Sequence, residues 1–397
     1  MGFSEGEACF KIKPRYRGKS NVHSFSLEFE IHLHIDDKNL LFYIRDSLGV
    51  GTVYLREKSN SCSFIVGNEK DLRVLLAVFD KYKLNGIKYL DYLDFMKAFN
   101  LYFDRSGSLT DEMRHDILEL YEGINTGRTN FSMPFDHVVK ITPYWLLGLI
   151  EGEGSFYLRR NPIRPGFQIL LTAAQEPLLA KIKEYLENNL GFDQYSLWQI
   201  QNSSVLSITH KKAVGKSKPT VTFDIRDLRI LQNYFIPFLN RLDFLSKKGL
   251  DFSDFKIICK TMYDGGHKND ELKSLLVKLS HAINDFRLSS YNGSIPKQQL
   301  SENEMSMLVN ALPLSEYLPD GRVIDSATGQ VDYQNESSVY LIKKMDGEEL
   351  LVKSLKEAAD ILGCHYSTIS KRLDGSPFVA EVNGHTVKRI MVFGPLR

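Results

Sequence analysis

A nine-residue pattern of glycines and acids occurs twice in the chain, and this repetition constrains the fold more than any other feature. GFSEGEACF begins at Gly2 and GLIEGEGSF begins at Gly148, so both follow G-x-x-E-G-E-x-x-F. The second copy ends an apolar run, YWLLGLI, that is typical of a buried helix. A pattern repeated at this separation predicts a duplicated structural unit.

The segments that follow the two patterns come in the same order. Each pattern leads into a strand and a basic stretch, CFKIKPRYRGK and SFYLRRNPIR. Next come a second strand, a helical stretch that ends near a glycine, and a pair of strands. That pair is predicted as TVYLREKSNSCSFIV in the first copy and as SLWQIQNSSVLSI with TVTFDIR in the second. Helical segments with D-L-R and L-D-x-x-D-F close both copies, which predicts an α+β fold with two pseudo-symmetric αββαββα repeats.

The spacing of the glycines and acids indicates how the two copies meet. Gly148 and Gly152 lie four residues apart, on one face of a helix, and Gly2 and Gly6 repeat the spacing. Glycine in a helix costs about 1 kcal/mol relative to alanine, which is tolerated where another backbone approaches closely. Two helices packed through these glycines would bring their terminal acids together, and paired carboxylates favour a divalent cation such as Mg²⁺. The alternative is that the acids only cap or solvate helix ends.

The motifs, the duplication and the element order together resemble the LAGLIDADG homing endonucleases in their double-motif, single-chain form. The resemblance covers roughly residues 1–285. It implies that each repeat lays a twisted four-stranded sheet along the major groove of double-stranded DNA. It also implies a monomer that cleaves both strands near the centre of a long site with Mg²⁺, leaving short 3′ overhangs. Glu7 and Glu153, the last acids of the motifs, would bind the metal, whereas Glu5 and Glu151 match a less constrained position.

Further catalytic residues follow from the resemblance by position. Family members carry a residue after the second strand that supports the metal or its waters, which corresponds to Asp37 and Gln175. They also carry a lysine just before the L-D-x-x-D-F helix, near the scissile phosphates, which corresponds to Lys88 and Lys248. A cation there would stabilise charge that develops on the phosphate. The alternative for each lysine is an ordinary solvated charge.

Basic residues follow both motifs at the same place. On strand pairs they are predicted to contact DNA, with phosphates providing affinity and base edges providing specificity. The predicted contacts are Lys11, Lys13, Arg15, Arg17, Arg159, Arg160 and Arg164. Exposed strand positions such as Arg56, Gln199 and Gln201 are candidates for reading bases. Two ordinary charged hairpin turns are the alternative.

The last quarter of the chain has a different pattern. Turn residues cluster from about residue 288, which predicts a linker with short local structure over 288–336. Within 337–397, SLKEAADILGCHYSTISKRL contains a capping box, an apolar helical face, a glycine stop and a second short helix. This is a helix-turn-helix signature, and it resembles the small DNA-binding modules of intron-encoded endonucleases. Predicted DNA contacts are Ser367, Lys371 and Arg372, with Lys388 and Arg389 as further candidates. A helical hairpin without a DNA role is the alternative.

These patterns predict four segments: a first repeat over 1–135, a second repeat over 136–287, the linker, and the C-terminal module. Only Met1 precedes Gly2, whereas ITPYWLL precedes Gly148, so we expect a shortened first motif helix. A reading frame fused to an upstream exon, an incorrectly assigned start or a decayed copy would each produce this pattern.

Three functions are consistent with the sequence. The first is a site-specific DNA endonuclease encoded by a mobile intron, which the acid at both motif ends favours. The second is a maturase that binds its host intron RNA, and the third is a DNA-binding regulator or an inactive relic. The resemblance alone suggests a mitochondrial product.

Composition excludes several other classes of protein. The net charge of +1 is unusual for a dedicated nucleic-acid binder, although it does not show how the charges are distributed. The four cysteines are widely spaced, which argues against a zinc ribbon and for a reduced compartment. No apolar run approaches the length of a membrane span.

Overall fold

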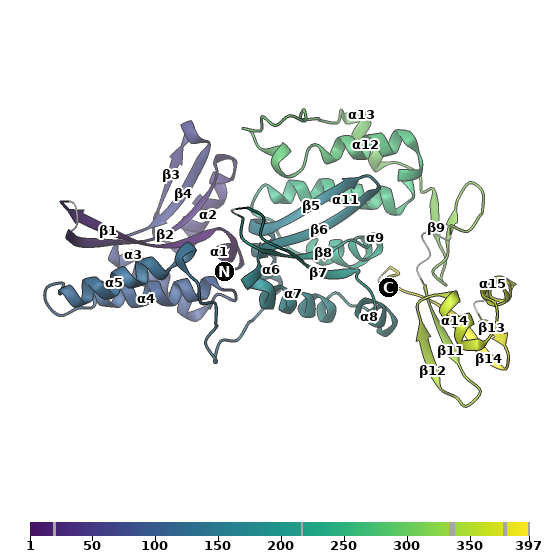
Figure 1. Cartoon of the computed structure of the whole chain (residues 1–397). Coiled ribbons are helices and arrows are strands. Elements are labelled where there is room, and N and C mark those ends of the chain that lie inside the picture. The colour runs from purple at the N-terminus through teal and green to yellow at the C-terminus, as the bar shows by residue number, and fades with distance from the viewer. Residues whose placement is uncertain (19–20, 216, 333–337, 376–378, 396–397) are drawn as a thin grey trace.

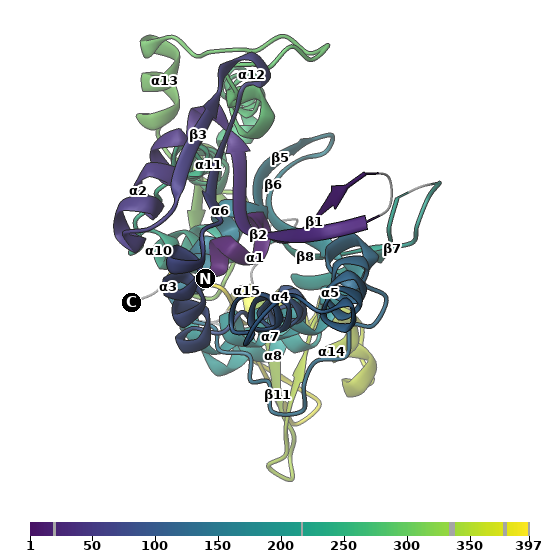
Figure 2. The ribbon, with the colours of Figure 1, turned by 90° about the vertical axis from the view of Figure 1, so that its left-hand side faces the viewer.

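The computed structural model describes residues 1–18, 21–215, 217–332, 338–375 and 379–395. Figure 1 shows two similar units side by side and a smaller C-terminal unit beyond the second. Figure 2, turned by a quarter, looks along the row of units from the side of the first. Within the described residues, no helix is both long and apolar enough to cross a membrane.

Each of the two larger units begins with its motif helix and contains a four-stranded antiparallel sheet. The strand orders are β1-β2-β4-β3 and β5-β6-β8-β7, which are equivalent and confirm the predicted duplication and the α+β class. The main elements of the first unit are α1 (Gly2–Glu7), β1 (Ala8–Arg17), β2 (Asn21–His34), α2 (Lys38–Leu48), β3 (Thr52–Arg56), β4 (Ser61–Val66), α3 (Glu69–Lys81), α4 (Lys88–Phe103) and α5 (Asp111–Gly123). Those of the second are α6 (Pro143–Glu153), β5 (Gly154–Arg160), β6 (Ile163–Thr172), α7 (Glu176–Asn189), α8 (Gln194–Gln201), β7 (Leu206–Lys211), β8 (Thr220–Ile225), α9 (Leu228–Ile230), a π-helical turn (Leu231–Phe235), α10 (Ile236–Leu239), α11 (Lys248–Tyr263) and α12 (Asp270–Ser280).

The alternation predicted for the second strand is confirmed in β2. Phe25, Leu27, Phe29 and Ile31 are all at most 4% exposed and form one face of the strand. Helix α2 ends where the sequence predicts, because Gly49 adopts the left-handed conformation with φ of 70°. Alternating residues thus bury one face of the sheet under the helices and leave the other face outward.

The prediction of a strand over 196–208 was wrong in its first half, because residues 194–201 form helix α8. Asp193 caps this helix by accepting hydrogen bonds from the backbone N–H groups of Tyr195 and Ser196. Ser196 and Ile200, four residues apart, are buried on one helical face. Gln199 and Gln201 therefore lie on a helix and not at the strand positions from which they were predicted to read bases.

The two large units have separate hydrophobic cores. One core collects residues of β1, β2, β4, α3 and α4, and the other collects residues of α6, β5, β6, β8, α7 and α11. Met1 packs against both cores, at the point where the motif helices meet. The cores are thus joined through the two motif helices.

The segment predicted as a linker contains local structure that packs on the second unit. It includes α13 (Glu302–Val309) and the strand pair β9 (Ser315–Tyr317) and β10 (Val323–Asp325). Leu308 is buried against α11 and α12, and the ring of Tyr317 stacks on Tyr263 with centroids 4.1 Å apart. This part of the chain therefore runs along the second unit.

The C-terminal unit is a four-stranded antiparallel sheet with two helices. The sheet order is β12-β11-β14-β13. Its elements are β11 (Ser338–Lys343), β12 (Glu349–Val352), α14 (Leu355–Leu362), α15 (Tyr366–Gly375), β13 (Val379–Val382) and β14 (His385–Met391). After β14 the chain returns to the second unit, where Phe393 is buried and donates its backbone N–H to Ser196 Oγ at 3.0 Å.

Arg389 does not fit its predicted contact with a DNA phosphate. Its side chain is fully buried, and the guanidinium forms an ion pair with Asp320 at 3.3 Å. A buried cation needs such a partner because removal from water is costly. Arg389 thus links β14 to the segment that precedes the C-terminal unit, whereas Lys388 is exposed.

Candidate active site

The two motif helices pack against each other through their glycines, as predicted. A Cβ placed on Gly2 would lie 1.7 Å from the carbonyl oxygen of Trp145, and one on Gly148 would lie 2.7 Å from the backbone nitrogen of Phe3. Neither distance can accommodate a side chain, so only glycine allows this approach. Helix α1 has six residues and α6 has eleven, and the two run together between the units (Figure 1).

Glu7 and Glu153 end these helices, and each side chain lies over a glycine of the opposite helix. A Cβ on Gly6 would come within 2.9 Å of Glu153 Cγ, and one on Gly152 within 3.4 Å of Glu7 Cγ. Within the described chain, neither carboxylate accepts a hydrogen bond or forms an ion pair. Burial, and secondly repulsion from Glu153, raises the pKa of Glu7 to about 7. Burial also raises the pKa of Glu153.

This pair of carboxylates fits a divalent cation. Burial and mutual repulsion disfavour the charged forms, and a cation between the two groups would offset both effects. Elsewhere in the described residues no three histidine, cysteine or acidic side chains converge as a metal-binding group. An ion held by Glu7 and Glu153 would therefore need further oxygen ligands from water or from a bound phosphodiester, as Mg²⁺ sites commonly do.

A cavity of about 640 Å³ opens beside this pair at the seam between the units. Its lining includes Glu7, Asp37, Gly152, Lys247 and Lys248. Acids of the first repeat and lysines of the second therefore face one shared space.

Glu5 and Glu151, the first acids of the motifs, are almost fully buried and have structural contacts. Oε1 of Glu5 accepts hydrogen bonds from the backbone N–H groups of Asn85 and Gly86. Oε1 of Glu151 accepts equivalent bonds from Leu245 at 2.6 Å and Ser246 at 2.7 Å. These acids therefore hold the loops that lead into α4 and α11, a role that the sequence did not reveal.

Lys88 and Lys248 are the first residues of α4 and α11, and both point back to the motif ends. Nζ of Lys88 donates to the carbonyl oxygens of Gly6, at 3.0 Å, and Ala8. Nζ of Lys248 donates to the carbonyl oxygen of Gly154 at 2.5 Å. Burial lowers the pKa of both lysines, while nearby acids act in the opposite direction. Each ammonium group is thus half-buried beside the acid pair instead of free in solvent.

Asp37 and Gln175 cross the seam to the residues that precede these two lysines. Oδ1 of Asp37 accepts a hydrogen bond from the backbone N–H of Lys247 at 3.0 Å, and Oδ2 forms an ion pair with its Nζ at 2.9 Å. Oε1 of Gln175 accepts a bond from the backbone N–H of Ile87 at 3.1 Å. Each repeat therefore positions the lysine of the other.

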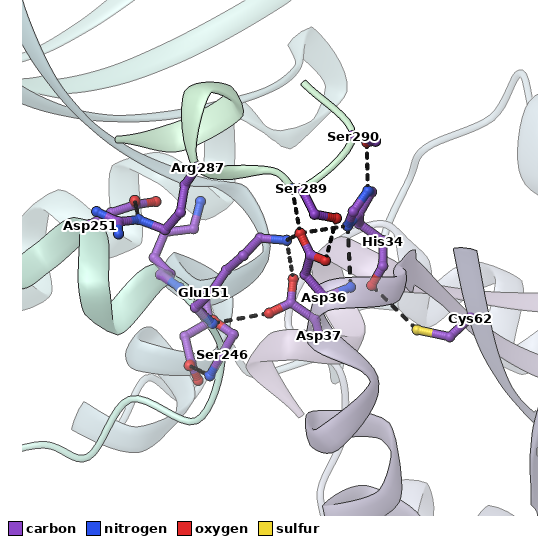
Figure 3. A network of polar contacts seen from close by, with 12 residues as sticks. His34, Asp36, Asp37, Cys62, Glu151, Ser246, Asp251, Arg287, Ser289 and Ser290 are labelled. Carbon is purple, nitrogen blue, oxygen red and sulfur yellow. Dashed lines mark hydrogen bonds and ion pairs between the residues drawn. The ribbon is translucent and has the colours of Figure 1, made fainter. Parts of the chain in front are cut away.

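The contacts around Asp37 extend into a wider network of polar contacts between the repeats (Figure 3). Asp36 accepts hydrogen bonds from the backbone N–H and the hydroxyl of Ser289 at 2.8 and 2.7 Å. His34 contacts the hydroxyl of Ser290 at 2.7 Å. Ala174 precedes Gln175 as Asp36 precedes Asp37, and alanine cannot make such contacts.

A second set of matched residues was not predicted, although it is present in the sequence as a repeated pattern. Ile-Asn-x-x-Arg occurs at residues 124–128 and again at 283–287. In both copies the asparagine has positive φ and its side-chain amide donates to a carbonyl of the first strand of the repeat. The arginines pair with the two aspartates of L-D-x-x-D-F: Arg128 with Asp91 and Asp94, and Arg287 with Asp251 and Asp254. The aspartates of this motif thus serve the fold.

The predicted DNA-contacting basic residues lie on strands, but their environments differ between the repeats. Lys11 forms an ion pair with Glu30, and Lys13 forms one with Glu28 at 2.5 Å. Arg15 and Arg17, further along β1, are exposed. In the second repeat Arg159, Arg160 and Arg164 are exposed at the ends of β5 and β6. Arg56 ends β3 and donates to Ser63 Oγ.

The helix pair of the C-terminal unit forms where the sequence predicts. Ser354 caps α14, Gly363 ends it with φ of 62°, and α15 begins at Tyr366. The carboxylate of Glu357 accepts from the backbone N–H of Lys353 and not from the Ser354 N–H that a capping box requires. Ser367 is half-buried, Lys371 is exposed, and the guanidinium of Arg372 donates to the carbonyl oxygen of Glu381.

The family model described as LAGLIDADG endonuclease matches residues 1–99 and 146–259, which together exceed half of the chain. The chain therefore belongs to the LAGLIDADG family.

Two curated relatives extend this assignment. The chain is 32% identical over 200 residues to the probable intron-encoded endonuclease Cox1-I1b of Schizosaccharomyces pombe, a match that covers 48% of this chain and 49% of the relative. It is 26% identical over 307 residues to the uncharacterized mitochondrial protein RF1 of Saccharomyces cerevisiae, covering 74% of this chain and 60% of the relative. The chain spans about half the length of the curated relatives that it matches.

A solved structure shows the same fold. The LAGLIDADG homing endonuclease I-GzeII, in complex with its DNA target, superposes with a TM-score of 0.60 at 20% sequence identity. The superposition covers 72% of this chain and 97% of I-GzeII. At this identity the likeness establishes the architecture of the two repeats.

Proposed function

We propose that this protein is a site-specific double-strand DNA endonuclease encoded by a mobile intron. The observation that carries the proposal is the pair of glutamates, Glu7 and Glu153, one from each repeat. They lie against each other's helices and have raised pKa values, and Glu7 lines the cavity at the seam. Membership of the LAGLIDADG family and the intron-encoded relatives support the same function.

Glu7 and Glu153 are the proposed ligands of Mg²⁺ or another divalent cation. A cation held there supplies Lewis acidity for phosphodiester hydrolysis. Lys88 and Lys248 would stabilise negative charge on the phosphate groups that enter the cavity. Asp37 and Gln175 hold the backbone just before these lysines, so we assign them a positioning role.

The two sheets are the proposed DNA-binding surface, with a monomer spanning a long site. Arg15, Arg17, Arg159, Arg160 and Arg164 are exposed on the strands and can reach phosphates. We propose the same division as the sequence predicts: repeats over 1–135 and 136–287, a connecting segment, and a module over 337–397. In that module Ser367, Lys371 and Arg372 on α15 would extend the DNA contact as a helix-turn-helix does. A mitochondrial location follows from the RF1 relative and is part of the proposal.

Cleavage of a plasmid that carries the intron-less insertion site tests the proposal. We expect linear product with Mg²⁺ from the wild type and none from Glu153→Gln, since an amide is a poorer cation ligand than a carboxylate. Glu119→Gln, an exposed glutamate on α5, is the matched control and should cleave normally. If the wild type bound the site but neither it nor the control cleaved, the endonuclease assignment would be wrong.

A further inference from the structure

A second polar cavity, of about 590 Å³, lies at the outer end of the second sheet, beneath the tip of the β5–β6 hairpin. The tip is at the end of β5 and β6 nearest β9 in Figure 1. Cations dominate its lining: Arg160, Arg164, Arg226, Arg229 and Lys273. Asp227 is the one acid among the described lining residues. This excess of positive charge lies outside the acid pair and cavity at the seam.

Four of the five cations of this cavity fall into two groups, and the fifth, Arg160, donates from Nε to Ser280 Oγ at 3.4 Å. Arg229 is held by Asp227 at 2.6 Å, and Arg226 by Asp224 at 2.7 Å, so these side chains have fixed positions. Arg164 and Lys273 are exposed and form no ion pair within the described chain. Two fixed arginines and two cations without an acidic partner make a site with unsatisfied positive charge.

Within the described residues, the first repeat differs from the second in charge at three equivalent positions, which the strand registers identify. Phe29 pairs with the last residue of β4 as Phe167 pairs with the last residue of β8, so these positions are equivalent. The residue after β4 is Gly67, whereas the residue after β8 is Arg226. Glu28 and Glu30, which neutralise Lys13 and Lys11, correspond to Gly166 and Gln168 in the second repeat. The second repeat has therefore gained an arginine and lacks both acids.

The chemistry of the cavity fits a phosphate group. Guanidinium groups bind phosphate oxygens through paired N–H donors, and lysine adds a flexible point charge. The cavity opens beside β5 and β6, the strand pair assigned to DNA under the proposed function. We propose that it binds a backbone phosphate of the target duplex at the outer end of the second half-site. This inference rests on the proposed function. It predicts that the second repeat binds DNA more tightly than the first.

The test compares a charge-removing double variant with a matched control. Arg164→Gln with Lys273→Gln removes the two unpaired cations, and Lys181→Gln with Lys183→Gln removes two cations from α7. Binding to a random-sequence duplex is measured in EDTA, which prevents cleavage, at several salt concentrations. Each lost phosphate contact should reduce the slope of log K against log salt by about 0.9. We expect the pocket variant to lose about one such unit and the control to retain the wild-type slope.

A second measurement does not depend on the variants. The amine of Lys273 in the wild type is acylated with and without the duplex, and its modification is read by mass spectrometry. Protection by the duplex supports the site, while protection by inorganic pyrophosphate alone would assign the cavity to a free phosphate ligand. The salt dependence of binding can also be measured with a structured RNA. If the pocket substitutions reduced the slope of log K against log salt for the RNA and not for duplex DNA, the DNA assignment would be overturned.

The outcomes separate the two proposals. If the wild type bound duplex DNA but the pocket variant kept its slope and Lys273 stayed fully reactive, the phosphate site would be wrong and the endonuclease proposal would stand. If the wild type bound no duplex at low salt, both proposals would fail together.

Discussion

The two repeats are nearly identical where they meet and different where they face outward. At the seam both contribute a glycine-faced helix, a terminal glutamate, a buried glutamate that holds a loop, and a lysine directed at the motif end. At the outer ends, the first repeat neutralises its lysines with Glu28 and Glu30, while the second carries a basic cavity. Under the proposed function, one shared cation site would constrain the seam in both repeats, whereas the outer ends would face different halves of the DNA target.

The seam itself has one clear asymmetry. Asp36, Asp37 and His34 of the first repeat contact Lys247, Ser289 and Ser290 of the second. The matching side provides the single hydrogen bond from Ile87 to Gln175. The residues that precede Lys248 therefore make more contacts across the seam than those that precede Lys88. The ammonium groups of both lysines nevertheless donate to carbonyl oxygens at the motif ends.

The largest expected effect concerns the matched arginines. Arg128→Ala and Arg287→Ala should each lower the free energy of unfolding by about 3 kcal/mol, because each removes the cation that pairs with two largely buried aspartates. Urea denaturation measures the loss. Arg114→Ala, which breaks an exposed pair with Asp111, should cost less than about 1 kcal/mol. A large loss in one repeat only would show that the matched contacts are not energetically equivalent.

The glycine seam should respond next. Gly148→Ala places a Cβ 2.7 Å from a backbone nitrogen, so we expect a loss of about 1–3 kcal/mol in unfolding free energy. In Gly152→Ala the new Cβ meets Glu7 Cγ at 3.4 Å, a contact that a small shift of the side chain relieves. Gly123→Ala, at the open end of α5, is the control and should be neutral or stabilising. Equal losses from Gly148→Ala and Gly123→Ala would exclude the close helix contact.

The asymmetry of the seam predicts a smaller difference. Asp36→Ala removes both hydrogen bonds to Ser289, and Gln175→Ala removes one hydrogen bond, so losses of about 2 and 1 kcal/mol are expected. Hydrogen exchange gives the local readout: the Ser289 amide should exchange faster in the first variant and the Ile87 amide in the second. If the Ser289 amide exchanged as slowly in Asp36→Ala as in the wild type, the predicted asymmetry of the seam would be wrong.

The pH dependence of stability tests the acid pair of the seam separately. The pKa of Glu7 is about 7 in the folded protein, whereas the ordinary pKa of a glutamate is 4.5. The folded protein therefore binds a proton at Glu7 more tightly than the unfolded chain does. Without metal, stability should fall as the pH rises from about 5 to 8. Glu7→Gln removes this loss, so its melting temperature in EDTA should exceed that of the wild type at pH 8 and match it near pH 5. A difference that did not change with pH would contradict the shifted pKa.

Features set by local spacing or by repetition were predictable from the sequence. The glycine spacing predicted the helix seam, and the alternation in β2 predicted its buried face, because both depend on residue periodicity alone. Helix α8 was not predicted, since Trp198 and Ile200 suit a strand equally well and only the Asp193 cap and the buried Ser196 decide the matter.

The sequence placed Glu7 and Glu153 at the ends of the packed motif helices, but it did not reveal the contacts of the residues around them. The cross-seam partners of Asp37 and Gln175 lie 210 and 88 residues away in the chain, so no local pattern could reveal them. Arg389 looked like a phosphate contact because its partner, Asp320, lies 69 residues earlier in a turn-rich segment. The Ile-Asn-x-x-Arg repeat was visible, and a systematic alignment of the two copies would have found it.

The proposed function depends most on one claim, that Glu7 and Glu153 form a single cation site with an acid from each repeat. Thermal unfolding at pH 8, with and without Mg²⁺, tests it directly in the wild type, Glu7→Gln, Glu153→Gln and the control Glu119→Gln. A ligand that binds only the folded state raises its melting temperature. We predict that Mg²⁺ raises the melting temperature of the wild type and the control and leaves both motif variants unchanged. A Mg²⁺-dependent rise that persisted in either motif variant would contradict the shared site.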